Sequence, residues 1–157
     1  MKIPEFQLRG IDEEGREVTL SSQDLRGRWT IIYFYPRDNT PGCTTEAKEF
    51  SALRDEFDKL GVRIIGISRQ SVESHKRFRE KHGLRIALLS DPDAAVHKAF
   101  GAWGKKRMYG REVEGVIRST FLVSPEGQIV KEWKNVRAKG HAARVLEEIK
   151  EIVGGKK

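Results

Sequence analysis

An apolar run that leads directly into a helical pattern is the feature that most restricts how this chain folds. Residues 31–35 read Ile-Ile-Tyr-Phe-Tyr, which is typical of a strand buried on both faces. Apolar residues then recur three or four positions apart, at Ala47, Phe50, Leu53, Phe57 and Leu60. This spacing predicts a helix over residues 41–60, ended by Gly61. A central strand that turns at once into a helix is the basic unit of sheets with parallel strands.

Strand-like and helical segments alternate along the next third of the chain. The predicted elements are strands at residues 62–67 and 86–89, and helices at residues 71–82 and 91–100. Ser71 is a typical helix N-cap, and Gly83 and Gly101 stand where the two helices are expected to stop.

The two ends of the chain carry turn signals. A polar turn at residues 12–15 predicts an N-terminal hairpin. Residues 124–127, Ser-Pro-Glu-Gly, suit a four-residue turn between strands at 120–123 and 128–130, which predicts a second hairpin. A last amphipathic helix, which the pair Gly154-Gly155 is expected to end, carries Val145, Leu146, Ile149 and Ile152.

This order of elements predicts an α/β fold. Parallel strand–helix–strand units followed by a hairpin and a closing helix form a mixed central β-sheet flanked by helices. It is the order of a thioredoxin-like fold with an N-terminal β-hairpin added. The 157 residues contain no repeat or linker, so a single domain over residues 1–157 is expected.

Composition limits the partners and the location. The formal charge is +7, but acidic residues are interleaved with the basic ones, which predicts an ion-pair-rich surface. Binding of nucleic acid or another polyanion is the weaker alternative. The N-terminus does not follow a signal-peptide pattern, and apolar runs are too short for a membrane helix, so a cytoplasmic protein without membrane contact is expected. The single cysteine, Cys43, excludes an internal disulfide and multi-cysteine metal sites.

Cys43 lies where the central strand turns into the helix. Thr40 is a natural N-cap and Pro41 suits the first helical position, while Gly42 allows a ligand to approach the backbone. Cys43 then falls in the first turn, where free N–H groups and the helix dipole favour a thiolate over the ordinary thiol, whose pKa is about 8.5. The alternative is a small buried cysteine on the apolar side of the helix. The Thr-Pro-Gly sequence directly after a central strand favours the reactive interpretation.

The segment around Cys43 resembles the signature of the peroxiredoxins, in particular of their bacterioferritin-comigratory or PrxQ-type branch. The matching residues are Tyr35-Pro36-Arg37-Asp38-Asn39-Thr40-Pro41-Gly42-Cys43-Thr44-Thr45-Glu46. Further matches are Gly66-Ile67-Ser68, Leu88-Leu89-Ser90-Asp91, Trp103-Gly104 and Arg118-Ser119-Thr120-Phe121-Leu122. The resemblance covers nearly the whole chain in the expected order.

The resemblance implies a thiol peroxidase. Cys43 would be the peroxidatic cysteine, which attacks hydrogen peroxide or an alkyl hydroperoxide and becomes a sulfenic acid. Thr40 would bind the peroxide through its hydroxyl, Pro36 would shield the pocket from water, and Arg118 would hold thiolate and substrate. Glu46 occupies an acidic position beside the site. It is expected either to orient Arg118 or to be a plain first-turn helix acid.

Backbone amides complete the expected site, and no cofactor is expected. The N–H groups of Gly42 and Cys43 would help to bind the substrate. The peroxiredoxin chemistry implied by the resemblance needs no metal, haem or flavin. Taken alone, Arg118 has a simpler interpretation as a surface strand residue, and Thr40 as a helix cap only.

The chain departs from the PrxQ pattern at Lys48. Many PrxQ-type proteins carry a resolving cysteine five positions after the peroxidatic one, and here that position is Lys48. The partners therefore expected are a hydroperoxide and an external thiol, namely thioredoxin, glutaredoxin or a small thiol, and the chain is expected to be a monomer or weak dimer. A thiol–disulfide oxidoreductase would need a Cys-x-x-Cys pair, which the sequence lacks. A non-enzymatic peroxide sensor or polyanion-binding protein is the remaining alternative.

Other candidate residues are weaker. The histidines lack the spacing of metal ligands and are expected at the surface or half-buried on helices: His75, His82, His97 and His141. Residues 105–107, Lys-Lys-Arg, are expected in a loop before Arg118. Trp103 and Tyr109 in the same loop either wall the pocket or pack on the core.

Overall fold

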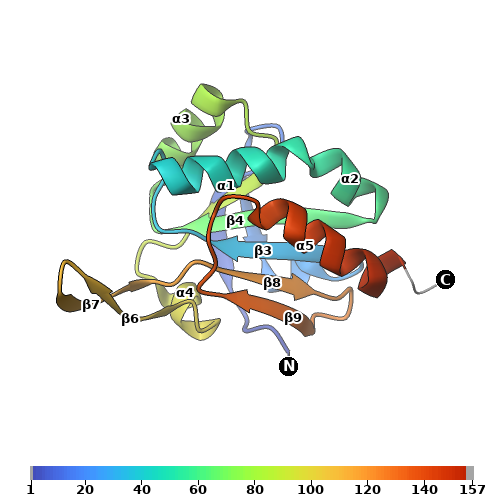
Figure 1. Cartoon of the computed structure of the whole chain (residues 1–157). Helices are drawn as coiled ribbons and strands as arrows, with labels where there is room; N and C mark the ends of the chain where they lie inside the picture. The colour runs from blue at the N-terminus through green and yellow to red at the C-terminus, as the bar shows by residue number, and fades with distance from the viewer. Residues whose placement is uncertain (1, 155–157) are drawn as a thin grey trace.

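A mixed sheet of seven strands forms the centre of the protein in the computed structural model, which describes residues 2–154 (Figure 1). Its strand order is β2-β1-β5-β4-β3-β8-β9. The strands are β1 (Gln7–Ile11), β2 (Glu17–Ser21), β3 (Trp29–Phe34), β4 (Val62–Ser68), β5 (Ala87–Ser90), β8 (Ser119–Val123) and β9 (Ile129–Lys134). The helices are α1 (Pro41–Ala52), α2 (Arg54–Lys59), α3 (Val72–His82), α4 (Ala95–Ala99) and α5 (His141–Ile149), with short helical turns η1 (Ser22–Leu25) and η2 (Lys150–Gly154).

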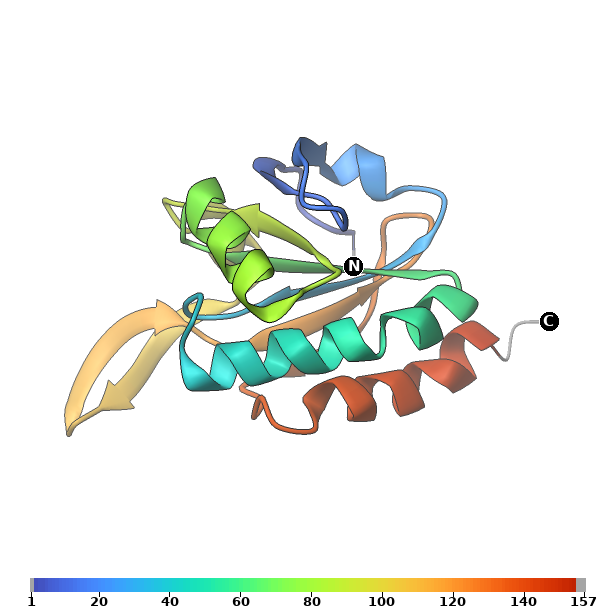
Figure 2. The ribbon, with the colours of Figure 1, turned by 90° about the horizontal axis from the view of Figure 1, so that it is seen from above.

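Strand β3 lies near the centre of the sheet, parallel to β4 on one side and antiparallel to β8 on the other. Its residues from Ile31 to Phe34 are fully buried because helices cover both faces of the sheet. Tyr33 faces a core formed with α1, α3 and α5, whereas Phe34 faces a core formed with η1 and α4. Figure 2 shows α1 and α5 side by side on one face of the sheet. The predicted α/β fold with a mixed sheet is confirmed.

Most predicted elements are present. The N-terminal hairpin is β1–β2, and the second hairpin is β8–β9. Ser71 caps α3 by accepting a hydrogen bond from the Ser74 N–H at 3.1 Å, and Gly83 ends that helix in the left-handed region with φ 63°. The last helix ends as a π-helical turn at Gly154, and Gly155 lies outside the described residues.

Two predicted helix boundaries are wrong. The single helix over residues 41–60 is divided at Leu53, whose ψ of 3° bends the chain between α1 and α2. The bend directs Phe57 into the core, where it is fully buried against β4. The helix predicted from residue 91 begins only at Ala95, because residues 91–94 first form a turn in which Ala94 has φ 62°.

The predicted loop over residues 105–107 is also wrong. These residues belong to an antiparallel hairpin of β6 (Trp103–Met108) and β7 (Arg111–Val116), which extends from the body beside the beginning of α1 (Figures 1 and 2). The turn uses two left-handed residues, Tyr109 and Gly110, with φ 54° and 76°. Because most of the hairpin is solvated, its sequence lacks the alternation that reveals a half-buried strand.

Three histidines lie deeper than predicted. His75, His97 and His141 are at most 1% exposed, and only His82 is half-buried. Each buried ring has a polar partner. His75 bonds to Asp38 and His141 to Thr120, both on distant segments, and His97 bonds to Asp91, six residues earlier. Among the described residues, no group of three or more His, Cys, Asp or Glu side chains is arranged to hold a metal ion. Within residues 2–154, none of the helices has the length and apolar character needed to span a bilayer.

Candidate active site

Cys43 lies in the first turn of α1, directly after the segment that follows β3, and is 1% exposed. Pro41 occupies the first helical position, as predicted. The first intrahelical hydrogen bond runs from the Thr44 N–H to the Thr40 carbonyl at 2.8 Å. The N–H groups of Gly42 and Cys43 precede it, so helix geometry gives them no partner within α1. The sulfur therefore lies at the positive end of the helix dipole.

The sulfur of Cys43 accepts two hydrogen bonds. The backbone N–H of Arg37 and the Nη2 of Arg118 each lie 3.4 Å from Sγ. Arg118 immediately precedes β8, and the pairing of Ser119 with Phe34 places it beside the end of β3. The pairing of β3 with β8 thus places the guanidinium of Arg118 near the point where the chain leaves β3 and enters α1. Two positively polarised groups converge on one buried sulfur.

Glu46 binds the other side of the same guanidinium. Its Oε1 lies 2.5 Å from Arg118 Nη1, and the residue has no exposed surface. Burial raises the pKa of Glu46 to about 7, against the opposing pull of the Arg118 charge. Burial lowers the pKa of Arg118, but the charges of Glu46 and Cys43 outweigh it and raise the pKa overall. Arg118 is therefore held on both sides, by Glu46 and by the Cys43 sulfur.

Thr40 stands at the N-cap position but does not make the expected cap hydrogen bond. Its hydroxyl instead donates to the Arg37 carbonyl at 2.8 Å, which ties together the loop whose N–H reaches the sulfur. Gly42 faces Arg118 closely: a Cβ at this position would lie 3.3 Å from Nη2. Pro36 is half-buried at the start of the loop. The structure therefore brings Cys43, Glu46 and Gly42 together around Arg118. Thr40 belongs to the site through the Arg37 loop, and Pro36 lines a cavity together with Arg118.

A buried polar cluster that sequence reasoning missed holds the same loop. Asp38 accepts hydrogen bonds from Tyr35 Oη at 2.6 Å and from Ser74 Oγ at 2.8 Å, and its Oδ2 lies 2.7 Å from His75 Nδ1. Its N–H donates to Gln70 Oε1 at 2.9 Å. Asp38 lies within the motif, but its partners on α3 follow more than thirty residues later, so no local pattern predicts the cluster.

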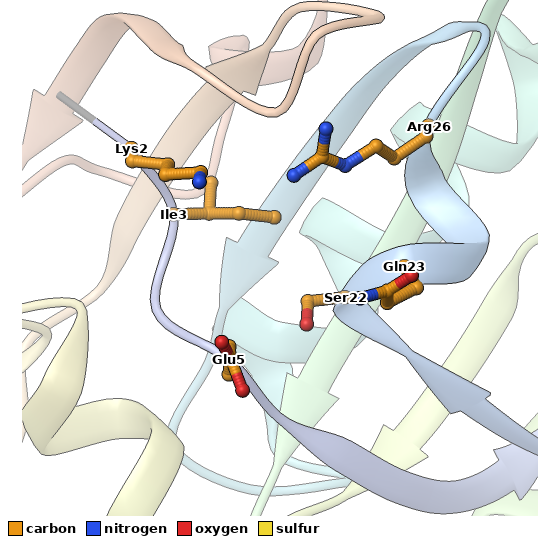
Figure 3. Close-up of a pocket in the computed structure, with 6 residues that line it drawn as sticks. All are labelled: Lys2, Ile3, Glu5, Ser22, Gln23 and Arg26. Atoms are coloured by element: carbon orange, nitrogen blue, oxygen red, sulfur yellow. The ribbon is translucent and has the colours of Figure 1, made fainter.

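Of two cavities described here, only one adjoins this site. One of about 170 Å³ lies at the N-terminal segment, where Lys2 and Arg26 face it (Figure 3). None of the six site residues lines it. The other, of about 600 Å³, is lined by Pro36 and Arg118 together with residues of β6, β7 and β9. Neither Trp103 nor Tyr109 lines this cavity: Trp103 packs against His97, and Tyr109 is 97% exposed.

Comparison with known proteins identifies the family of this chain. The AhpC/TSA family profile matches residues 1–132. Peroxiredoxin Bcp of Xanthomonas campestris is 51% identical over 136 residues, which cover 87% of this chain and 84% of the relative. Peroxiredoxin Bcp of Bacillus subtilis is 42% identical over 151 residues, which cover 96% of this chain and 94% of the relative.

Solved structures show the same likeness. A mutant of Xanthomonas campestris peroxiredoxin Q has a TM-score of 0.83 and 48% sequence identity, and the match covers 94% of this chain and 91% of that chain. Because the family profile and these relatives span most of the chain, it belongs to the AhpC/TSA family as a peroxiredoxin of the Bcp or PrxQ type, and it is a thiol-dependent peroxidase.

Proposed function

We propose that this protein reduces hydrogen peroxide and alkyl hydroperoxides through a sulfenic acid on Cys43, in a one-cysteine cycle completed by an external thiol. The observation that carries the proposal is the pair of hydrogen bonds that Arg37 and Arg118 donate to the Cys43 sulfur. A sulfur that accepts two such bonds is held as a nucleophile. Alkyl hydroperoxides are included because a related Xanthomonas campestris structure, 47% identical, is described by its alkyl peroxide reduction activity.

The chemical step is a displacement at oxygen. The thiolate of Cys43 attacks the terminal oxygen of R–O–OH, the S–O bond forms and the O–O bond breaks. The alkoxide that leaves takes up a proton and departs as an alcohol, or as water when R is hydrogen. Sulfur loses two electrons and becomes a sulfenic acid. Negative charge moves from sulfur to the leaving oxygen, so donors that surround both atoms stabilise the transition state.

Each neighbouring residue has a role in this step. The guanidinium of Arg118 stays protonated, and Glu46 holds it where it stabilises the negative charge as that charge passes from sulfur to oxygen. The N–H groups of Gly42 and Cys43 and the hydroxyl of Thr40 bind the peroxide oxygens. Pro36 covers the mouth of the site beside Arg118 and limits the access of water.

The single cysteine determines how the cycle ends. Lys48 stands at the position where many PrxQ-type proteins carry a resolving cysteine, and the chain contains no cysteine besides Cys43. The sulfenic acid therefore cannot form a disulfide within the chain. An external thiol must reduce it, or Cys43 of a second copy must react with it.

Peroxide consumption in the presence of dithiothreitol tests the proposal. The wild type is expected to consume hydrogen peroxide and to gain the mass of one oxygen atom when treated with one equivalent of peroxide alone. Cys43→Ser should lose both properties and keep its fold by circular dichroism. Thr45→Ser, which changes a residue in the same helical turn, is the matched control and should retain both. Peroxide turnover by Cys43→Ser would refute the proposal.

A further inference from the structure

The cavity beside the site carries a charge pattern that reduction of a small peroxide does not require. Its volume is about 600 Å³, within the range of pockets that bind whole metabolites. Its lining includes five cationic side chains, Lys105, Lys106, Arg107, Arg118 and Lys134. Among the described residues, no aspartate or glutamate lines it. We call this cavity the basic groove.

Apart from the charge of Arg118, which is paired with Glu46, little of this positive charge is neutralised locally. The ammonium group of Lys106 donates a hydrogen bond to the Val116 carbonyl at 2.7 Å, so its positive charge is not paired with a carboxylate. Arg107 is exposed and forms no ion pair within residues 2–154. Lys105 lies 4.0 Å from Glu112 and Lys134 lies 3.6 Å from Glu132, and all four side chains are solvated. Exposed pairs of this kind are weak, so the groove keeps a positive potential.

Arg118 connects the basic groove to Cys43. Arg118 lines the groove and its Nη2 lies 3.4 Å from the Cys43 sulfur, and Pro36 lines the groove from the loop beside the site. Lys105, Lys106 and Arg107 lie on the hairpin that extends from the side of the molecule where α1 begins (Figures 1 and 2). A small molecule in the groove whose anionic end rests against the hairpin therefore lies beside Arg118, which contacts the Cys43 sulfur.

We infer that the basic groove binds the reductant, and that the reductant is a small thiol that carries one or more carboxylates. The inference rests on the proposed function, because only a one-cysteine cycle requires an outside thiol at Cys43. Carboxylates match the cations of the hairpin and of Lys134, while a peroxide without charge gains nothing from them. The same cations also favour ionisation of the bound thiol, and the thiolate is the form that attacks.

The reduction balances over two thiols. The sulfur of the first thiolate attacks the sulfenic sulfur of Cys43, an S–S bond forms, the S–O bond breaks, and hydroxide leaves and is protonated to water. A second thiolate attacks the sulfur of the bound thiol, which releases Cys43 as a thiolate and a small-molecule disulfide. The two thiols supply the two electrons that the peroxide removed.

Three thiols of different charge test the inference on the whole protein. Cys43 is first oxidised with one equivalent of hydrogen peroxide, and loss of the sulfenic acid is then followed by mass spectrometry with mercaptopropionate, mercaptoethanol or cysteamine. Each rate is divided by the rate of the same thiol with a small disulfide in solution, which removes intrinsic reactivity. The normalised rate with mercaptopropionate is expected to exceed that with cysteamine by about tenfold, and added NaCl should reduce the difference.

Variants that change the charge of the hairpin test whether the preference for mercaptopropionate arises in the basic groove. The double variant Lys105→Gln/Arg107→Gln, at two exposed positions, should lower the preference for mercaptopropionate at least fivefold, and Arg107→Glu should shift it toward cysteamine. The matched control is Arg77→Gln/Lys81→Gln, which removes the same charge from exposed positions on α3 and should leave the preference unchanged.

The outcomes separate the inference from the proposed function. If peroxide does not oxidise Cys43, the proposed function fails. If oxidation proceeds and the three normalised rates are equal, the inference fails alone. A charge preference that appears only in the oxidation step, with a carboxylated hydroperoxide compared with tert-butyl hydroperoxide, would assign the groove to the peroxide and overturn the reductant assignment.

Discussion

Arg118 and Cys43 are 75 positions apart in the chain, yet Arg118 Nη2 lies 3.4 Å from the Cys43 sulfur. The contact depends on the antiparallel pairing of β8 with β3, because Arg118 precedes β8 and Cys43 follows β3. Glu46, one helical turn beyond Cys43, holds the second nitrogen of the same guanidinium. A buried sulfur, a cation and a carboxylate thus form one unit whose parts come from two chain segments.

Replacement of Arg118 by lysine should slow the oxidation of Cys43 by hydrogen peroxide about 100-fold, as loss of a transition-state donor does. Lysine keeps the positive charge but cannot direct two forked N–H groups at Glu46 and Cys43 together. Stopped-flow measurement of the oxidation rate checks this. Arg77→Lys, an exposed change on α3, is the control, and equal rates for the two variants would remove Arg118 from its role.

The Gly42→Ala variant should be about as stable as the wild type but should react with peroxide about tenfold more slowly. The added Cβ would lie 3.3 Å from Arg118 Nη2, and Arg118 has little room to move because Glu46 and Cys43 hold it. The helical preference of alanine offsets the crowding, so the free energy of unfolding should change by less than about 1 kcal/mol. An oxidation rate equal to that of the wild type would show that the close approach is unimportant.

Asp38→Asn should destabilise the fold by about 3 kcal/mol, because it replaces a buried carboxylate, hydrogen-bonded to Tyr35, Ser74 and His75, by an amide that has only one acceptor oxygen. The loop that brings the Arg37 N–H to the sulfur should loosen, so oxidation of Cys43 should slow as well. Urea unfolding and stopped-flow oxidation measure the two effects. Asp55→Asn breaks an exposed pair with Arg85 and should change stability by less than about 1 kcal/mol.

The free energy of unfolding should fall as pH rises from about 5 to about 8, and Glu46→Gln should remove most of this fall. The pKa of Glu46 is about 7 in the folded protein against an ordinary value of 4.5, so the folded state keeps a proton that the unfolded state releases. The stability that this proton provides is fully present below pH 4.5 and is lost as pH rises through 7. Its size is on the order of 3 kcal/mol.

His141 contributes to the pH dependence of stability in the opposite sense, and its contribution must be separated from that of Glu46. Burial, with the charges of Arg144 and Arg118, lowers the pKa of His141 to about 4, so its contribution is lost as pH falls from 6.5 toward 4. The wild type and Glu46→Gln share this residue, so it cancels in the difference between their urea unfolding curves. Parallel pH profiles for the two proteins would contradict the assignment to Glu46.

Lys48→Cys should convert the one-cysteine cycle into an intramolecular one, with partial loss of α1. Residues five apart in a helix have Cα atoms about 8.7 Å apart, beyond the reach of a disulfide, so the bond can form only if the helix unwinds. Peroxide should therefore produce a disulfide together with a loss of helical circular dichroism. Lys59→Cys on α2 is the control, and a disulfide formed without loss of helix would contradict the geometric argument.

Local chemistry explains why much of the site was predictable from sequence. The apolar run before Thr40 predicts a buried strand, and the Thr-Pro-Gly sequence predicts the helix start that carries Cys43, because both signals depend on neighbours in the chain. The exact use of the Thr40 hydroxyl was not predictable. Its choice between an N–H group of the helix and the Arg37 carbonyl depends on the shape of the loop.

Long-range burial explains what the sequence did not reveal. His75 and His141 are polar residues on helices, and their burial is favourable only because each finds a partner on a distant segment. The β6–β7 hairpin, predicted as a loop, is mostly solvated and so has no apolar pattern to reveal its strands. Its lysines line the basic groove only because the folded hairpin lies beside Arg118.

Apart from the β6–β7 hairpin, the sequence by itself determined the order of strands and helices, and it determined the position of the one cysteine at a helix start. These features follow from apolar spacing and turn chemistry within a few residues. Only the tertiary structure decided that Arg118 and Glu46 meet at Cys43, and that Asp38 is held by α3. Strand pairing and burial join residues that are distant along the chain, and the spacing of residue types does not encode those distances.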